Sequence, residues 1–247
     1  MNIIDLTGKT FIVTGAGSGI GRETTRVLTE QGASVMMLDI NETGLSETAS
    51  LAGPYCHPSY VDLTDSAAVA DVVSKIVEEY GKIDGLVHCA GISSRKPLNV
   101  LSKEGFSKVM DVNFYSFVEL VKQCAKKRHI NDGASIVVMS SISSIRGYKA
   151  KTEYCVSKAA VDAFVRCMAL ELADRKIRVN SVMAAEVLTP LALKARETNA
   201  AVGASDFHAP LGPSEPYEVA NTIAFLLSNA TKTITGTSIL IDGGACV

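Results

Sequence analysis

The 247-residue sequence lacks the cysteine and histidine patterns of disulfide-rich and metal-binding proteins. Its six cysteines form no Cys-x-x-Cys pair, and several lie inside apolar runs, where a free cysteine behaves as a small hydrophobic residue. Its four histidines are too widely spaced along the chain to predict a metal site. We therefore expect free thiols, a reducing cytoplasm and no resident metal.

Strong basic charge and long apolar runs are also missing. The formal net charge is -2 at pH 7, with 20% charged and 47% hydrophobic residues. This composition is typical of a soluble globular protein and lacks the basicity that nucleic-acid phosphates require. No apolar run approaches the roughly 18 residues of a membrane span, and the acid and lysine in segment 1–15 do not suit a secretory signal. We expect neither nucleic acid nor membrane as a partner.

Short apolar runs and helical patterns alternate along the chain. The apolar runs occupy segments 10–15, 33–39, 57–63, 84–91, 134–141, 177–184 and 237–244, and helical periodicity marks segments 21–32, 66–81, 106–127 and 158–175. This rhythm predicts an α/β fold, a single domain over residues 1–247. We expect a Rossmann-like, doubly wound parallel sheet of about seven strands with helices on both faces. Ligands of such a sheet bind outside the carboxyl ends of its strands.

The segment from about residue 186 to 216 has no strand character. It is rich in turn-forming residues, which are Gly203, Pro210, Gly212, Pro213 and Pro216. A loop of this length inside a compact domain is usually functional. We predict that it forms a lid over a substrate.

A glycine-rich turn joins the first apolar run to the first helical pattern. The sequence FIVTGAGSGIGRE contains Gly15, Gly17, Gly19 and Gly21. Such a turn lets the backbone approach a pyrophosphate and directs helix N-terminal N–H groups at it. Glycines alone also occur in plain tight turns, so the prediction of a dinucleotide site depends on the residue that ends the second apolar run.

Asp39 ends that second run, eighteen residues after Gly21. A carboxylate there accepts hydrogen bonds from both ribose hydroxyls of NAD and repels the 2′-phosphate of NADP. The flanking positions hold no basic residue, because Ser18 stands in the glycine turn and Ile40 comes directly after the aspartate. We predict NAD(H) in preference to NADP(H), against the alternative that Asp39 is a solvated strand end.

Tyr154 and Lys158 lie four residues apart at the start of a helical pattern, so they share one helix face. An ammonium near a phenol favours the phenolate, and a tyrosine so tuned can move a proton near neutral pH. The pair alone occurs easily by chance. Ser141 strengthens the prediction, because it closes an apolar run thirteen residues earlier, at a predicted ligand-binding strand end.

The glycine turn, Ser141 and the Tyr-x-x-x-Lys pair together resemble the short-chain dehydrogenase/reductase superfamily. The resemblance covers essentially the whole chain. VDLTD supplies Asp62, MDVNF supplies Asn113, RVNSV matches the strand before the lid, and ITGTSILIDGG matches the closing strand.

The resemblance implies a role for each matched residue. Tyr154 is implied as the acid/base and Ser141 as a hydrogen-bond donor to the reacting oxygen. Lys158 is implied to bind the nicotinamide ribose and lower the tyrosine pKa, and Asn113 to hold a relay water. The implied cofactor contacts are Gly15, Ser18, Gly19, Ile20, Gly21, Asp39, Ile40, Asp62, Leu63, Cys89, Ala90, Gly91, Tyr154, Lys158, Val187 and Thr189. Plain structural roles for Ser141, Asn113 and Lys158 remain the alternatives.

The sequence departs from the family pattern at two places. His88 and Cys89 replace two asparagines, and we expect His88 to stabilise a strand. Ala184 and Ala185 replace a Pro-Gly pair, which puts the turn there in doubt because proline fixes φ and glycine permits positive φ. Glu186 is either a solvated acid or an acceptor for substrate hydroxyls. Thr189 and Pro190 match the family, and candidates for the pocket wall are Ser93, Ser94, Ser143, Tyr148, Leu191 and Leu193.

The residues and the resemblance favour an NAD(H)-dependent oxidoreductase that moves a hydride between nicotinamide and a secondary alcohol or ketone, such as a sugar, polyol or hydroxysteroid. One alternative is a 3-oxoacyl-(acyl-carrier-protein) reductase, against which Asp39 counts because that activity more often uses NADPH. Another is a non-catalytic NAD-binding regulatory protein, since fold alone does not fix function. The helix at 159–173 is apolar on nearly every face, so we also expect a homo-oligomer, a dimer or tetramer.

Overall fold

The computed structural model describes residues 3–193 and 209–247. Seven strands form one parallel sheet in the order β3-β2-β1-β4-β5-β6-β7. The strands are β1 Thr10–Thr14, β2 Ser34–Asp39, β3 Cys56–Tyr60, β4 Ile83–His88, β5 Ile130–Ser141, β6 Arg178–Ala184 and β7 Ser238–Ile241. This arrangement confirms the predicted doubly wound sheet.

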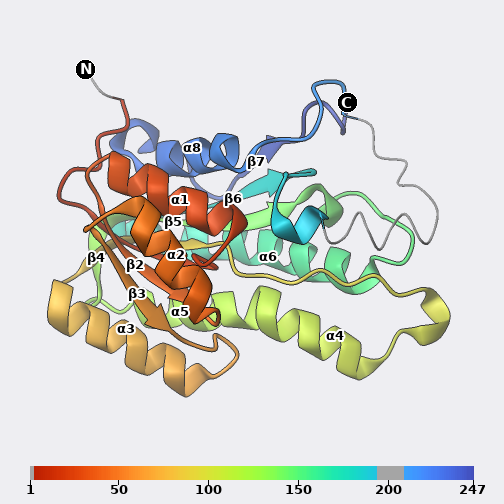
Figure 1. Cartoon of the computed structure of the whole chain (residues 1–247), viewed down its shortest axis with the longest axis horizontal. Helices are drawn as coiled ribbons and strands as arrows, with labels where there is room; N and C mark the ends of the chain where they lie inside the picture. Colours follow the sequence, from red (N-terminus) through yellow and green to blue (C-terminus); the bar gives the residue numbers. More distant parts are fainter. Residues whose placement is uncertain (1–2, 194–208) are drawn as a thin grey trace.

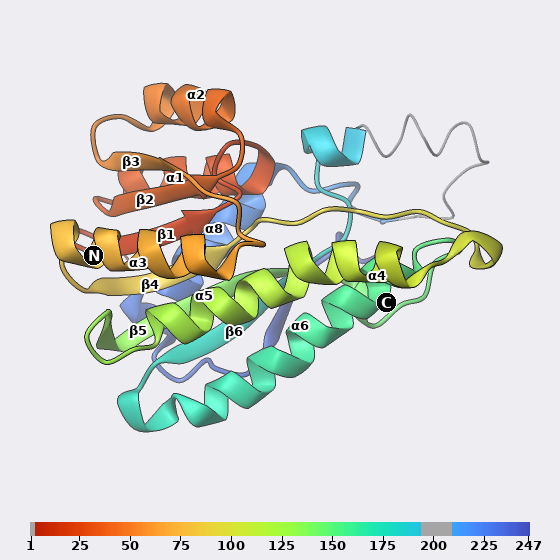
Figure 2. The ribbon, with the colours of Figure 1, turned by 90° about the horizontal axis from the view of Figure 1, so that it is seen from below.

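Helices cover both faces of the sheet (Figures 1 and 2). One layer contains α1 Gly19–Glu30, α2 Glu42–Ala52 and α8 Pro216–Leu227, and the other contains α3 Ser66–Tyr80, α4 Lys103–Met110, α5 Ser116–Cys124 and α6 Thr152–Glu171. Successive strand residues point to opposite faces, so Phe11 and Val13 pack in the first layer while Ile12 packs in the second. The strands are therefore apolar on both faces, as the continuous apolar runs predict.

The strand order reverses between β1 and β4. The chain runs outward from β1 to β2 and β3, then returns to pair β4 with the other side of β1. In open α/β sheets a crevice forms at such a reversal, outside the carboxyl ends of the strands. Thr14, Asp39, His88, Ser141 and Ala184 end their strands at that edge.

The helical pattern predicted over 106–127 is interrupted. A π-helical turn over Asp111–Tyr115 separates α4 from α5. Its centre is Asn113, which is fully buried and hydrogen-bonded to a neighbouring loop. π-turns inside helices are frequent at functional sites.

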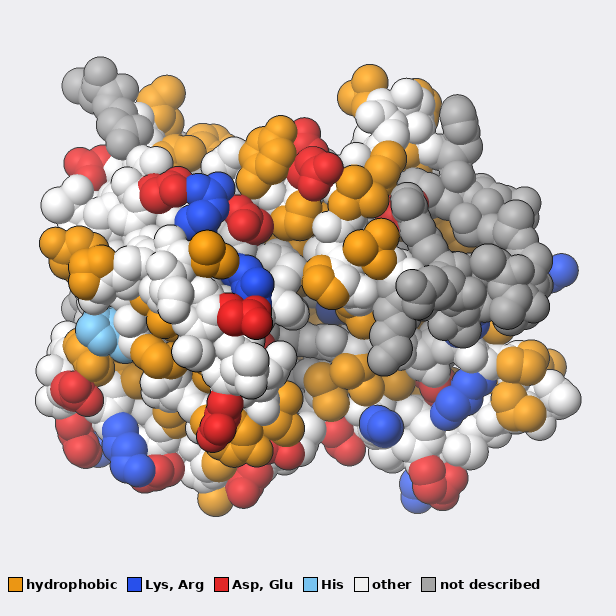
Figure 3. All heavy atoms as spheres, in the orientation of Figure 1, with side chains coloured by type: hydrophobic (Ala, Val, Ile, Leu, Met, Phe, Trp, Pro, Cys, Tyr) orange, Lys and Arg blue, Asp and Glu red, His pale blue; other side chains and the backbone are white. Residues whose placement is uncertain are grey.

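Charged side chains of both signs are interspersed over the described part of the face in Figure 3, so that part of the surface offers no broad basic area. Among the described residues, no helix is long and apolar enough to cross a membrane.

Candidate active site

The glycine turn between β1 and α1 is formed by close backbone contacts. A side chain at Gly21 would place its Cβ 2.2 Å from the carbonyl oxygen of Gly15. Gly15 itself has φ +67°, and a Cβ there would lie 2.8 Å from the nitrogen of Ala90. Gly19 begins α1, so the first N–H groups of that helix face the carboxyl edge of the sheet. The turn is a cradle that only glycines can form.

Asp39 lies beside this turn. Its carboxylate accepts hydrogen bonds from the N–H groups of Gly17 and Asn41, both at 2.9 Å. Arg22 also lies here, and its guanidinium donates to the carbonyl of Gly17 at 2.6 Å and pairs with Glu47 at 2.7 Å. Sequence reasoning missed Arg22 because it considered only Ser18 within the glycine turn and Ile40 after Asp39. The Gly17 carbonyl and Glu47 hold this arginine. The region beside the turn therefore contains one cation, Arg22, and two carboxylates, Asp39 and Glu47.

The remaining adenosine-side candidates lie at the exposed rim. Ile40 is 59% exposed, and Leu63 is half-buried. Asp62 accepts hydrogen bonds from the N–H and hydroxyl of Thr64 at 2.9 and 2.7 Å, which lower the pKa of its carboxyl. Asp62 is thus an ionised side chain with one carboxylate oxygen still open for a ligand.

Ser141 and Tyr154 come together at the end of β5. The Ser141 hydroxyl oxygen accepts from the N–H of Ser143 at 3.1 Å, which leaves its O–H to donate. Burial raises the pKa of Tyr154, and its neighbour Ser141 lowers it by less. Without a cofactor, burial therefore outweighs the neighbouring groups, and the lowered tyrosine pKa that the resemblance implies with the nicotinamide ring bound stays a prediction.

Lys158 lies beneath this tyrosine. Its ammonium donates to the carbonyl of Met139 at 2.8 Å and sits 5.7 Å from the centre of the Tyr154 ring. The side chain is 5% exposed, and burial lowers the pKa of its ammonium to about 8, with Asp162 opposing the shift. An ammonium that donates one hydrogen bond to the protein retains two N–H donors for a ligand.

Asn113 ties the π-turn to the loop after β4. Its amide donates to the carbonyl of Ile92 and the hydroxyl of Ser157, both at 3.0 Å, and its side-chain oxygen accepts from the N–H of Ile92 at 2.8 Å. A side chain at Gly91 would place its Cβ 3.2 Å from that oxygen and 3.7 Å from the Lys158 nitrogen. Both amide hydrogens of Asn113 are thus used inside the protein, and only acceptor capacity remains for a water.

His88 stabilises the strand ends, as expected. Its Nδ1 lies 2.9 Å from the Thr14 hydroxyl, its Nε2 lies 3.3 Å from the Ser116 hydroxyl, and its ring stacks on Phe117. The Thr14 oxygen accepts from the N–H of Ala90, so its O–H can donate to Nδ1 of His88. The Ser116 hydroxyl donates to the carbonyl of Val112, so its oxygen can accept from Nε2. A neutral imidazole with its proton on Nε2 fits both bonds. Burial, then Lys158, lowers the His88 pKa to about 3.

Cys89, next along the chain, is a thiol whose pKa burial raises to about 12. It is therefore not a nucleophile at neutral pH.

The two alanines that replace the Pro-Gly pair do not disturb β6, the strand that Ala184 ends. Ala184 pairs with Ser141 and Ile241 inside the sheet, and the Ala185 N–H donates to the carbonyl of Ile241 at 3.0 Å. Ala185 does not have positive φ. The backbone here simply extends the ladder, so alanine suits both positions.

The segment predicted to form a lid begins against the glycine turn. Val187 is buried and forms a bridge with Ser214. Thr189 is 8% exposed, and a Cβ at Gly19 would lie 3.2 Å from its methyl group. A helical segment starts at Pro190, where Leu191 and Leu193 are each 50% exposed. The part of the predicted lid at 194–208, with Gly203, lies outside the described residues.

The other pocket-wall candidates have different surroundings. Ser93 is exposed and Ser143 is buried, while the Tyr148 hydroxyl is buried without a partner among the described residues. Ser94 instead donates to the buried carboxylate of Glu153. The ammonium of Lys96 lies 3.4 Å from the same carboxylate.

Glu153 was missed by sequence reasoning, because a charged residue next to Tyr154 has no local signal of burial. Its carboxylate ties the loop after β4 to the start of α6.

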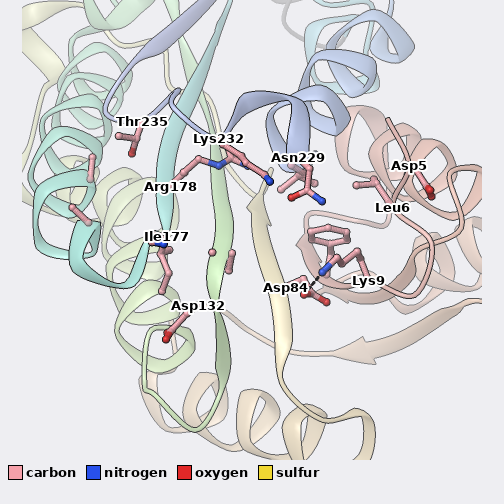
Figure 4. A pocket seen from close by; sticks show the side chains of 17 residues that line it. Asp5, Leu6, Lys9, Asp84, Asp132, Ile177, Arg178, Asn229, Lys232 and Thr235 are labelled. Carbon is pink, nitrogen blue, oxygen red and sulfur yellow. Dashed lines mark hydrogen bonds and ion pairs between the residues drawn. The ribbon is translucent and has the colours of Figure 1, made fainter. Parts of the chain in front are cut away.

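A separate cavity of about 570 Å³ lies at the opposite edge of the sheet (Figure 4). Its lining includes Lys9, Asp84 and Arg178, which lie at or near the amino ends of β1, β4 and β6. Lys9 and Asp84 form a 3.0 Å ion pair there. None of the predicted site residues lines it. Among the described residues, no cluster of three or more histidine, cysteine or acidic side chains is suited to a metal.

The comparisons with known proteins agree with this arrangement. A family described as enoyl-(acyl carrier protein) reductase matches residues 15–246. The chain is 36% identical to a 3-oxoacyl-(acyl-carrier-protein) reductase of Thermotoga maritima, over 98% of this chain and 99% of that protein. It is 31% identical to an NAD-dependent glycerol dehydrogenase of Listeria innocua, over 97% and 94% of the two chains.

A solved structure, the ligand-free aldohexose dehydrogenase of Thermoplasma acidophilum, has the same fold. It superposes with a TM-score of 0.86 and 31% identity, and the match covers 97% of this chain and 94% of that one. With family, relatives and fold in agreement over nearly the whole length, the chain belongs to the short-chain dehydrogenase/reductase superfamily and is an oxidoreductase that acts on CH–OH groups.

Proposed function

We propose that the protein oxidises a secondary alcohol, or reduces the corresponding ketone, with NAD(H) in preference to NADP(H). The observation that carries this proposal is the placement of Ser141, Tyr154 and Lys158 around one point at the carboxyl edge of the sheet, beside the glycine turn. Crevices at this edge are where doubly wound sheets bind nucleotides.

The chain's residues fit a dinucleotide. The contacts of Gly15 and Gly21 keep the turn free of side chains, as close approach by a pyrophosphate requires. The Asp39 carboxylate retains acceptor capacity for ribose hydroxyls, and Lys158 retains two donors. A bound nicotinamide dinucleotide supplies the hydride acceptor for oxidation and the hydride donor for reduction.

The protein then manages the proton on the substrate oxygen. In oxidation the Tyr154 phenolate, formed when its own proton leaves through the relay, takes the hydroxyl proton, and in reduction the Tyr154 phenol donates its proton to the substrate oxygen. The O–H of Ser141 donates to the same substrate oxygen and orients it. The positive charge of Lys158 beneath the ring stabilises the phenolate that Tyr154 becomes. Asn113 fixes the loop above Lys158 and contributes acceptor capacity to a proton relay.

Asp39 supports the choice of NAD(H). Its carboxylate repels a 2′-phosphate, and the cation nearby, Arg22, is paired with Glu47. The name of the Listeria innocua relative, an NAD-dependent glycerol dehydrogenase, agrees with this cofactor and with a polyol-like substrate.

Tyr154→Phe tests the proposal. A panel of secondary alcohols, sugars, polyols and hydroxysteroids is assayed with NAD, and the matching ketones with NADH. We expect turnover by the wild type and a loss of about 10²- to 10⁴-fold in the variant, with a much smaller change in NADH affinity. Full activity of the variant would remove Tyr154 from the mechanism.

A second candidate is reduction of 3-oxoacyl groups on a carrier protein. The Thermotoga maritima relative and the matching family description favour it. Turnover of a 3-oxoacyl thioester that is faster with NADPH than any alcohol oxidation with NAD would select it. Binding of NADH without turnover of either substrate class would instead support the non-catalytic alternative.

We also propose that the protein is a homo-oligomer and resides in the cytoplasm. Val156, Ala159, Ala163, Cys167 and Leu170 form an exposed apolar stripe on one side of α6, and Leu170 is 81% exposed. Such a stripe suits burial against another copy. A single monomer species in sedimentation velocity would contradict the assembly. The six cysteines are free, as a reducing compartment favours.

A further inference from the structure

Three loops bring charged side chains together at the mouth of the site. Lys151 lies immediately before α6, three residues ahead of Tyr154. The Lys96 N–H donates to the carbonyl of Ala150 at 2.6 Å, which joins the loop after β4 to this turn. Ala150 has φ +62°, a conformation that alanine adopts at a cost. This turn fixes where Lys151 lies relative to Tyr154.

The half-buried ammonium of Lys151 forms no hydrogen bond or ion pair with another residue that the structure describes. It lies 5.4 Å from the centre of the Tyr148 ring, and the Arg146 guanidinium lies 5.5 Å from the same centre. Burial lowers the pKa of Lys151, the charge of Arg95 lowers it further, and Glu186 opposes them. One carboxylate thus faces more than one cation.

The Tyr148 hydroxyl adds a donor. It is buried and has no hydrogen-bond partner among the described residues. Lys96, by contrast, is neutralised by Glu153. Lys151, three residues before Tyr154, is thus a half-buried ammonium that an anionic ligand can bind.

We infer that the substrate carries a carboxylate or phosphate that binds the ammonium of Lys151 while its alcohol carbon lies at Tyr154. The inference rests on the proposed oxidoreductase function and names its substrate class. In oxidation the C–H hydride passes to NAD⁺, the O–H proton passes to Tyr154, and the alcohol becomes a ketone. The anionic group is unchanged and fixes the substrate's orientation, so it must lie a few bonds from the alcohol carbon.

Matched substrate pairs test this inference. Short hydroxycarboxylates are compared with their carboxamides, and glycerol phosphate with glycerol, on the wild type, Lys151→Gln and the exposed control Lys149→Gln. We expect the wild type to favour the anion of at least one pair by tenfold or more in kcat/KM, mainly through KM. Lys151→Gln should reduce that ratio to near one, and Lys149→Gln should keep it. Preference for the carboxylate or for the phosphate pair identifies which anion is used.

Equal kcat/KM for anion and neutral partner in the wild type would overturn the inference, as would a preference that Lys151→Gln retains. If no alcohol is turned over, the proposed function fails. Calorimetric titration of the same pairs into the NADH complex then tests anion binding at Lys151 separately. Tighter binding of the anion that is lost in Lys151→Gln supports the inference, and equal binding of anion and neutral partner contradicts it.

Discussion

Lys158 lies one helical turn beyond Tyr154 on α6, with its ammonium 5.7 Å from the centre of the tyrosine ring and 5% of its side chain exposed. The fold therefore keeps a charged group in a buried position next to the proposed acid/base. Such an arrangement costs stability, and that cost gives a test that is independent of turnover.

Lys158→Met should stabilise the protein while abolishing its activity. Burial lowers the Lys158 pKa from 10.5 to about 8, so the unfolded chain binds the proton more tightly. Below pH 8 Lys158 is protonated in both the folded and the unfolded chain, and burying the charged ammonium destabilises the folded state. The free energy of unfolding rises between pH 8 and 10.5, where the folded protein has lost this proton and the unfolded chain still binds it. After allowing for the lost bond to Met139, we expect unfolding at pH 7 to cost about 1 to 2 kcal/mol more in the variant.

Urea unfolding without cofactor measures this difference, and Lys149→Met is the matched exposed control. Destabilisation by Lys158→Met would mean that the lysine serves the fold.

His88→Asn should weaken the acid sensitivity of the fold. The folded pKa of His88 is about 3 against 6.5 for a free imidazole, so the neutral form is favoured in the folded protein. The stability that the neutral His88 imidazole contributes is fully present above pH 6.5. It declines as pH falls toward 3, because the unfolded chain binds a proton there that the folded protein does not. Between pH 7.5 and 5.5 we expect the wild type to lose about 1 kcal/mol more stability than the variant. Identical pH profiles in denaturant unfolding would show that His88 titrates normally.

Gly21→Ala should abolish dinucleotide binding. Its Cβ would lie 2.2 Å from the Gly15 carbonyl oxygen, so the turn must open. Gly147→Ala is the control, since a Cβ there meets nothing within 4 Å and its φ is not positive. Fluorescence titration with NADH should show binding by the control and at least tenfold weaker binding by Gly21→Ala. Equal affinities would place the pyrophosphate elsewhere.

The sheet and much of the site can be predicted from the sequence, because continuous apolar runs mark strands buried on both faces and the runs end at Asp39, His88 and Ser141. The π-turn at Asn113 was not predictable. Helical periodicity continues through it, and Asn113 at its centre accepts a hydrogen bond from Ile92, which is distant in sequence. Arg22 and Glu153 were missed for the same reason, since tertiary contacts alone place them beside the site.

The most direct test of the proposed function is calorimetric binding of NADH and NADPH to the wild type and to Asp39→Ala. The Asp39 carboxylate, held by the N–H groups of Gly17 and Asn41, should favour NADH by at least tenfold, and the variant should lose that discrimination. Tighter binding of NADPH by the wild type would contradict the cofactor assignment and favour the carrier-protein reductase. Binding of neither nucleotide would contradict the proposed oxidoreductase.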